Sequence, residues 1–168
     1  YRNNVIMGRD TVLLWGKPTI LDALGRLHFH ISPRSFFQVN TQQAERLYEQ
    51  ALAYADLHGT ETVIDAYCGT GTITLFLAQR ARKVYGIEIV QPAILDARKN
   101  ARDNHVKNAE FIVGDAKKIM PALYKQGIRP DVVVVDPPRA GCTPTVLKTF
   151  ADMKPQRIVY VASDLAPL

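Results

Sequence analysis

The chain has 168 residues, 47% of them hydrophobic and 22% charged, and this composition excludes a disordered protein and suits one globular domain. Its formal net charge of +5 is compatible with a polyanionic partner, but charge alone leaves the partner open. The two cysteines form no C-x-x-C pair and no apolar run reaches the ~20 residues of a membrane span, so we expect a cytoplasmic protein with no metal site and no membrane partner.

The first 40 residues are predicted to lead into the main domain. Between residues 5 and 31, short apolar runs alternate with Gly, Pro and Asp, a pattern typical of short strands and turns. A helix is predicted to follow, with Asn40 as its N-cap and Gln43 three residues later. We therefore divide the chain into an N-terminal segment, residues 1–40, and a main domain, residues 41–168.

From residue 62 onward, strands and helices are predicted to alternate. Strands are predicted at 62–65, 84–88, 109–113, 131–135 and 157–161. Helices are predicted to begin near Thr72, Pro92, Lys117 and Pro144. This alternation predicts a Rossmann-like α/β fold, a parallel sheet with right-handed crossovers and helices on both faces. The chain ends shortly after the fifth strand, so we expect a truncated sheet that belongs to a larger protein.

The segment D-x-x-x-G-x-G, from Asp65 to Gly71, lies between a predicted strand and a predicted helix. Gly69 and Gly71 let the backbone adopt positive φ and let a ligand approach the main chain. The helix that begins at Thr72 adds free N–H groups. A dinucleotide fingerprint would need a third glycine where Thr74 stands. The segment instead resembles motif I of S-adenosylmethionine-dependent methyltransferases, so we expect S-adenosylmethionine as the cofactor.

Acidic residues mark the ends of the first three predicted strands. Asp65 would meet the amino-acid part of the cofactor, directly or through water. Glu88 lies where a carboxylate that accepts hydrogen bonds from both ribose hydroxyls belongs. Asp115 would accept a hydrogen bond from the adenine amino group. Each acid alone has a simpler explanation as a helix N-cap, but three at successive strand ends favour a cofactor site.

The apolar run Val132–Val135 stops at Asp136, and Pro137, Pro138 and Arg139 follow. Such a run predicts a buried parallel strand, and the two prolines predict a rigid, extended loop after it. Ligands of an open α/β sheet bind outside the carboxyl ends of the strands, so Asp136 and Arg139 are expected beside the substrate. The alternative is an ordinary loop between a strand and a helix.

Three segments together resemble motifs of the RNA 5-methyluridine (uracil-5) methyltransferases. They are F-F-Q-x-N at residues 36–40, the glycine segment at 65–71 and D-P-P-R-x-G at 136–141, and they occur in that family's order. The resemblance covers nearly the whole chain and identifies it as a fragment of such a catalytic domain. It implies methyl transfer to carbon-5 of uridine in RNA, and we favour ribosomal RNA over transfer RNA. We expect a monomer.

The resemblance also implies roles for individual residues. Gln38 would contact the cofactor or the target uracil, because an amide can pair with a uracil edge through a donor and an acceptor. Tyr67 would line the cofactor pocket. Asp136 would lie between the methyl donor and the base, and Arg139 would bind RNA phosphate or a loop carboxylate.

The chain departs from the family at the catalytic nucleophile. In the family, a cysteine thiolate from a Ser-Cys-Asn-Pro loop after the fifth strand adds to carbon-6 of uracil and makes carbon-5 nucleophilic. Here Ala162, Ser163 and Asp164 follow that strand, so no catalytic residue can be named and we expect cofactor binding without methylation. Either the cysteine loop is missing between Val161 and Leu165, which we favour, or the chain is a shortened or inactivated form.

Two other functions stay open. An exocyclic-amine methyltransferase acting on nucleic acid or protein would need no cysteine, although such enzymes usually carry an aromatic residue where this chain has Arg139. A non-catalytic RNA-binding module is the second alternative, and it would bind RNA but not S-adenosylmethionine.

Overall fold

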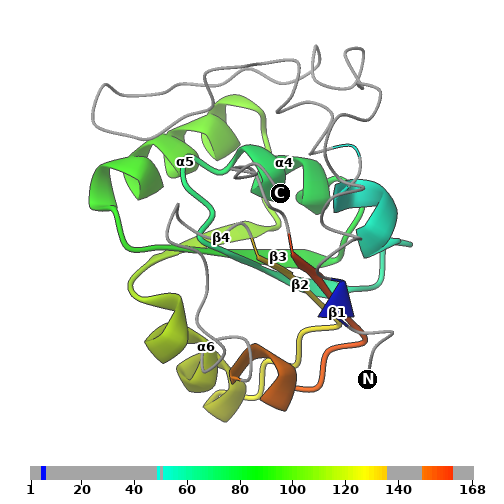
Figure 1. The fold of residues 1–168 in the computed structure, drawn as a ribbon. Coiled ribbons are helices and arrows are strands. Elements are labelled where there is room, and N and C mark those ends of the chain that lie inside the picture. The colour runs from blue at the N-terminus through cyan, green and yellow to red at the C-terminus, as the bar shows by residue number, and fades with distance from the viewer. Residues whose placement is uncertain (1–4, 7–48, 50, 136–148, 161–168) are drawn as a thin grey trace, which may run out of the picture.

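The computed structural model describes residues 5–6, 49, 51–135 and 149–160 of the chain. Its strands form a six-stranded sheet in which every pair is parallel, in the order β1-β6-β5-β2-β3-β4 (Figure 1). The strands are β1 (Val5–Ile6), β2 (Thr62–Ala66), β3 (Lys83–Glu88), β4 (Ala109–Val113), β5 (Val132–Val135) and β6 (Arg157–Tyr160).

Helices cover both faces of this sheet, as the sequence predicted (Figure 1). The labelled helices are α4 (Thr72–Ala78), α5 (Gln91–Asp103) and α6 (Ala116–Lys125), and residues 49, 51–55 and 149–152 are helical too. The helices α4 and α5 and the 51–55 segment lie on one face, while α6 and the 149–152 segment lie on the other. In the described part of the chain, no helix is long and apolar enough to cross a membrane.

The sheet has an apolar core on each side because its central strands are apolar on both faces. All four valines of β5 are buried. Val132 and Val134 belong to the core on the α4–α5 side, whereas Val133 and Val135 belong to the core on the α6 side. Successive side chains of a pleated strand point to opposite faces, so a continuous apolar run corresponds to a strand covered on both sides.

The predicted α/β fold is confirmed, and all five predicted strands are present with described ends within one residue of the prediction. The helices predicted near Thr72, Pro92 and Lys117 are α4, α5 and α6. In α5, Pro92 lies in the first turn, where its missing N–H has no intrahelical partner to lose. Within the predicted N-terminal strand region, β1 pairs with β6. The predicted helix starts at Asn40 and Pro144 lie outside the described residues.

The order of the strands locates the crevice in which a ligand can bind. The central strand β2 pairs with β3 on one side and with β5 on the other. The connection that leaves β2 runs toward β3, and the connection that leaves β5 runs toward β6, so the two diverge. Open α/β sheets bind their ligands at such a switch point, outside the carboxyl ends of the strands. The glycine loop after β2 lies at this edge.

Candidate cofactor site

The loop between β2 and α4 contains three residues with positive φ, Tyr67 (60°), Gly69 (59°) and Gly71 (86°). Glycine adopts such angles freely, whereas tyrosine is strained there. The Gly71 N–H donates to the carbonyl oxygen of Cys68 at 3.0 Å, which closes a tight turn, and Gly71 is also the N-cap of α4. A Cβ on Gly69 would meet no described atom within 4 Å, so the described residues leave space on this side of the loop.

Asp65, in β2, is held under the loop by a residue of α4. Its side chain is 1% exposed, and Oδ2 accepts a hydrogen bond from Thr74 Oγ1 at 2.5 Å. Thr74 is fully buried and occupies the position of the third glycine in a dinucleotide fingerprint. Burying a carboxylate is unfavourable without hydrogen-bond donors, and the Thr74 hydroxyl supplies one such donor to Asp65. The pair ties the end of β2 to the first turn of α4.

Glu88, the last residue of β3, joins two backbone segments. Its Oε1 accepts from the Gly69 N–H and its Oε2 accepts from the Val90 N–H, both at 3.0 Å. A carboxylate has about four acceptor positions, so each oxygen keeps one for a ligand such as a ribose hydroxyl. The structure therefore brings the second predicted acid and the glycine loop into one site.

Cys68 lies inside this site but is not suited to nucleophilic attack. Burial raises the pKa of its thiol well above the ordinary value, and the negative charges of Asp65 and Glu88 raise it further. A side-chain hydrogen bond with Thr74 has the opposite but smaller effect. Since the thiolate is the reactive form of cysteine, the protonated Cys68 is a weak nucleophile at neutral pH.

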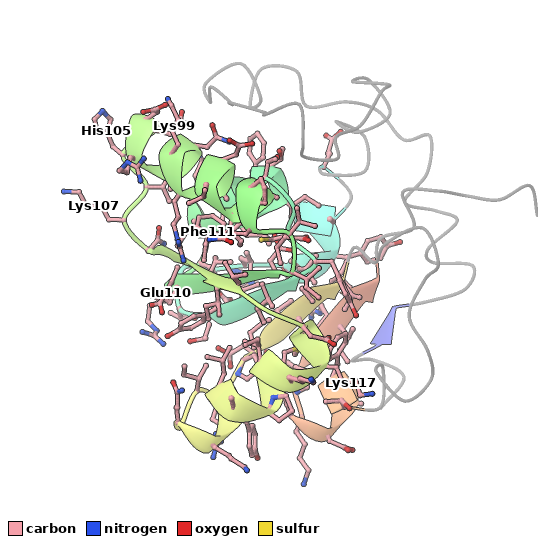
Figure 2. All side chains as sticks on the ribbon, turned by 90° about the vertical axis from the view of Figure 1, so that its left-hand side faces the viewer. Lys99, His105, Lys107, Glu110, Phe111 and Lys117 are labelled. Atoms are coloured by element: carbon pink, nitrogen blue, oxygen red, sulfur yellow. The ribbon has the colours of Figure 1, made fainter. Side chains whose placement is uncertain are left out.

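Phe111 of β4 packs against the loop, a role for which the sequence carried no signal. Figure 2 shows this side chain between the sheet and α5. A Cβ added to Gly86 would lie 2.8 Å from Phe111 Cδ1, and one added to Gly71 would lie 3.0 Å from two atoms of the ring. Neither position has room for a larger residue, so both glycines serve close packing against Phe111.

The carboxyl edge beyond Glu88 is apolar and exposed. Ile89 is 64% exposed, Val90 40% and Val113 39%. Asp115 lies two residues after Val113 and is the N-cap of α6, where Oδ1 accepts from the Lys117 N–H at 3.0 Å. The helix-cap explanation therefore holds for Asp115. Exposed aliphatic side chains near a carboxylate also suit a flat base that carries an amino group.

The structure places most of the predicted site residues at one edge of the sheet. Those in or directly after β2, β3 and β4 are Asp65, Tyr67, Gly69, Gly71, Thr72, Glu88 and Asp115. Gln38, Asp136 and Arg139 lie outside the described residues, and so does the segment between Val161 and Leu165. Among the residues that the structure describes, no three His, Cys, Asp or Glu side chains form a group able to hold a metal ion.

Residues 57–158 match the model of a family described as a methyltransferase domain. The chain belongs to that family. The matched range contains the glycine loop, Glu88 and Asp115, and the cofactor of this methyltransferase domain is S-adenosylmethionine, as the sequence predicted. The residues present fit this cofactor, because no described atom occupies the space beside Gly69 and Glu88 keeps acceptor positions. The cofactor has no pyrophosphate, so Thr74 in place of a third glycine is compatible with it.

Curated relatives agree with the family. Two proteins named as uncharacterized RNA methyltransferases, from Clostridium tetani and Halalkalibacterium halodurans, are 56% and 58% identical to the chain over 167 residues. Each match covers 99% of this chain and 36% of the relative. The chain therefore spans about a third of the length of these relatives.

Solved structures share the fold. The tRNA (uracil-54, C5)-methyltransferase of Pyrococcus abyssi, solved with S-adenosyl-L-homocysteine, is 36% identical, with a TM-score of 0.62 over 79% of this chain and 31% of that one. A Methanobacterium thermoautotrophicum protein described as precorrin 8w decarboxylase is 27% identical, with a TM-score of 0.65 over 79% of this chain and 68% of that one. Proteins of different names thus share this fold, so the fold alone does not identify the methyl acceptor.

Proposed function

We propose that this domain belongs to an RNA methyltransferase that methylates carbon-5 of uridine. The observation that carries the proposal is the 36% identity to the tRNA (uracil-54, C5)-methyltransferase across 79% of this chain. The relatives named as RNA methyltransferases support RNA as the substrate class. The segment D-P-P-R-x-G at 136–141 supports uracil over an exocyclic amine. Ribosomal RNA as the target, a cytoplasmic location and a monomeric state stay predictions.

The described site residues receive specific roles in this proposal. Glu88 would bind the ribose hydroxyls through the acceptor position left on each carboxylate oxygen. Asp115 would accept a hydrogen bond from the adenine amino group, beside the exposed side chains of Ile89 and Val113. The backbone at Gly69, Gly71 and Thr72, with Tyr67 beside it and Asp65 acting directly or through water, would hold the amino-acid part of the cofactor.

The remaining predicted residues would act on the base. Gln38 would pair with the uracil edge or contact the cofactor, Asp136 would lie between the methyl donor and the base, and Arg139 would bind phosphate. Carbon-5 of uracil is a weak nucleophile until a thiolate adds to carbon-6. Carbon-5 then takes the methyl group, a base removes the carbon-5 proton, and the thiolate leaves. The raised pKa of Cys68 argues against this residue as the thiolate.

Exposed basic side chains are compatible with an RNA partner. Lys99 and Lys107 lie toward one corner of the molecule and Lys117 lies elsewhere, near the start of α6 (Figure 2). Part of this positive charge is neutralised within the protein, because Lys99 forms an ion pair with Asp103 at 2.7 Å. Surface charge therefore supports a polyanionic substrate without choosing between RNA classes.

The proposal is tested with the full-length protein, S-adenosylmethionine carrying a labelled methyl group, and transcripts of ribosomal and transfer RNA. After digestion to nucleosides, mass spectrometry should find the label in 5-methyluridine. RNA containing 5-fluorouridine should form a covalent adduct with the protein, because the fluorine cannot be removed as a proton is.

Other products would contradict the proposal in distinct ways. A labelled methylamino nucleoside would identify an exocyclic-amine methyltransferase. RNA binding without calorimetric heat for S-adenosylmethionine would identify an RNA-binding module. A label in 5-methyluridine of transfer RNA alone would keep the reaction and correct the favoured target.

A further inference from the structure

We propose that Asn100 is a positioning residue for the cofactor, because its side chain fixes the orientation of the peptide bond between Thr70 and Gly71. This inference concerns the cofactor loop and not the methyl acceptor, so it goes beyond the proposed function and does not depend on uracil being the target.

The contact runs from a helix to the centre of the glycine loop. Asn100 lies on α5 and is 0% exposed, and its Nδ2 donates to the carbonyl oxygen of Thr70, 30 residues earlier, at 3.3 Å. Asparagine has a low helix propensity, and a buried amide is unfavourable unless it is hydrogen-bonded. An apolar residue would be expected at this buried position of the helix. The hydrogen bond to the Thr70 carbonyl explains why a polar residue is tolerated there.

The peptide between Thr70 and Gly71 is held at both ends. Its N–H, which belongs to Gly71, donates to the carbonyl oxygen of Cys68 at 3.0 Å. Its carbonyl, which belongs to Thr70, accepts the bond from Asn100. In a trans peptide these two groups point in opposite directions, so the two bonds together select one orientation of the peptide plane. Rotation of the plane by half a turn would break both.

Such a constraint is needed because Gly71 is conformationally permissive. Its φ is 86°, and glycine populates both signs of φ with similar ease, so the preceding peptide can rotate at little energetic expense. The helix α5 meets Gly71 a second time, since a Cβ there would lie 3.0 Å from Ala97 Cβ. Ala97 and Asn100 are three residues apart and share one face of α5, which therefore packs against the loop.

The orientation of this peptide determines the conformation of the glycine loop that would hold the cofactor. With Asn100 in place, the Thr70 carbonyl points toward α5. A rotated peptide would point the Thr70 carbonyl oxygen toward the Cys68 carbonyl oxygen, which now accepts from the Gly71 N–H, and the two oxygens would repel each other. The loop would then have to leave the conformation in which Gly69 and Glu88 are joined. Loss of the Asn100 donor should therefore weaken cofactor binding beyond any general loss of stability.

The first test compares two variants of the full-length protein by calorimetry with S-adenosyl-L-homocysteine. Asn100→Leu removes the donor at nearly constant volume. Asn104→Ala is the matched control, because the Asn104 side chain donates to the backbone carbonyl of Asn100 at 2.8 Å, a contact at the end of the same helix and not with the Thr70–Gly71 peptide. We expect roughly tenfold weaker binding for Asn100→Leu, as for loss of one buried hydrogen bond, and less than a twofold change for Asn104→Ala. Equal losses in both variants would overturn the proposal.

The second test observes the peptide itself and needs no cofactor. Thr70–Gly71 is the one Thr-Gly pair in these 168 residues, so carbonyl-¹³C threonine with ¹⁵N glycine selects its amide resonance, which is assigned from its loss in Thr70→Ser. Asn100→Leu should shift or split this resonance, and Asn104→Ala should leave it in place. An unchanged resonance in Asn100→Leu would refute the positioning role even if uracil methylation were confirmed. A shifted resonance would support the role even if another acceptor were found.

Discussion

Thr74 Oγ1 donates a hydrogen bond of 2.5 Å to Asp65 Oδ2, and both side chains are buried beneath the glycine loop. Thr74→Val keeps the shape of the side chain but removes this donor from a buried carboxylate. We expect the free energy of unfolding, measured with urea, to fall by about 2 kcal/mol, as for a buried hydrogen bond to a charged group. We also expect weaker binding of S-adenosyl-L-homocysteine, because the hydrogen bond that joins β2 to α4 beneath the loop would be lost.

Thr62→Val is the matched control for that variant. Thr62 lies at the other end of β2, where its Oγ1 accepts from Arg82 Nη2 at 2.6 Å. The Arg82 side chain is exposed and can turn to water, so we expect a smaller loss of stability and an unchanged affinity for the cofactor product. If Thr62→Val lost as much affinity as Thr74→Val, the Thr74–Asp65 hydrogen bond would have no specific effect on cofactor binding.

The parallel sheet, and the sheet edge at which the candidate site lies, were predictable from local patterns. The run Val132–Val135 indicated a strand buried on both faces, and Gly69, Gly71 and Glu88 marked the edge where ligands bind. These signals are local, because a turn that needs positive φ or a strand end needs its residue type at that point.

The supports of the loop were not predictable in the same way. Phe111 and Asn100 contact the loop from 40 and 30 residues further along the chain, counting from Gly71 and Thr70. A phenylalanine in a strand and an asparagine in a helix are ordinary residues until the tertiary fold gives them a neighbour. Thr74 was noticed as a departure from a dinucleotide motif, but its bond to Asp65 required the structure.

Amide substitutions of Glu88 and Asp115 separate the proposed cofactor-binding role of each acid from its structural role. Glu88→Gln leaves only one side-chain oxygen where two now accept from Gly69 and Val90, so an N–H group of the backbone would face the new amide NH₂. We expect at least tenfold weaker binding of S-adenosyl-L-homocysteine by calorimetry and a lower melting temperature. Asp115→Asn should behave differently, because asparagine is as good an N-cap as aspartate.

We therefore expect Asp115→Asn to keep the melting temperature while the affinity for the adenosine part of the ligand falls. Adenosine and S-adenosyl-L-homocysteine, titrated in parallel, measure this effect. Unchanged affinity for both ligands would leave Asp115 as a helix cap and remove it from the site.

Gly86 tests the packing of the loop without a change in backbone conformation, since its φ is not positive. A Cβ at Gly86 would lie 2.8 Å from Phe111 Cδ1 and 3.0 Å from Cys68 Sγ, so Gly86→Ala should lower the free energy of unfolding by about 1–3 kcal/mol, as overpacking does. Phe111→Leu in the same chain should restore part of the loss, because the ring is the closer neighbour. Urea unfolding of the two single variants and the double variant measures this coupling.

Gly69→Ala is the counterpart of Gly86→Ala. Its Cβ would meet no described atom within 4 Å, but Gly69 has a φ of 59°, so we expect backbone strain of about 1–2 kcal/mol and no rescue by Phe111→Leu. Rescue of both alanine variants by Phe111→Leu would mean that the ring affects stability globally and not through contact with Gly86.

The protonation of Cys68 predicts how the protein responds to alkaline pH. Burial, together with the charges of Asp65 and Glu88, raises the pKa of the Cys68 thiol in the folded state. Between the pKa of the unfolded thiol and that of the folded one, the folded state holds a proton that the unfolded state has released. Stability from this group is therefore complete below the unfolded pKa, about 8.5, and is lost as pH rises through the folded pKa.

Two measurements check this expectation in a Cys142→Ser background, which leaves Cys68 as the single thiol of these 168 residues. Alkylation by iodoacetamide at pH 8 should be slow in the folded protein and rapid in urea, because the thiolate is the reactive species. The free energy of unfolding should fall more steeply above pH 8.5 than it does after the additional change Cys68→Ala, which removes the titrating group. Alkylation of the folded protein at pH 7 as fast as that of the unfolded chain would contradict the raised pKa and would return Cys68 to the list of possible nucleophiles.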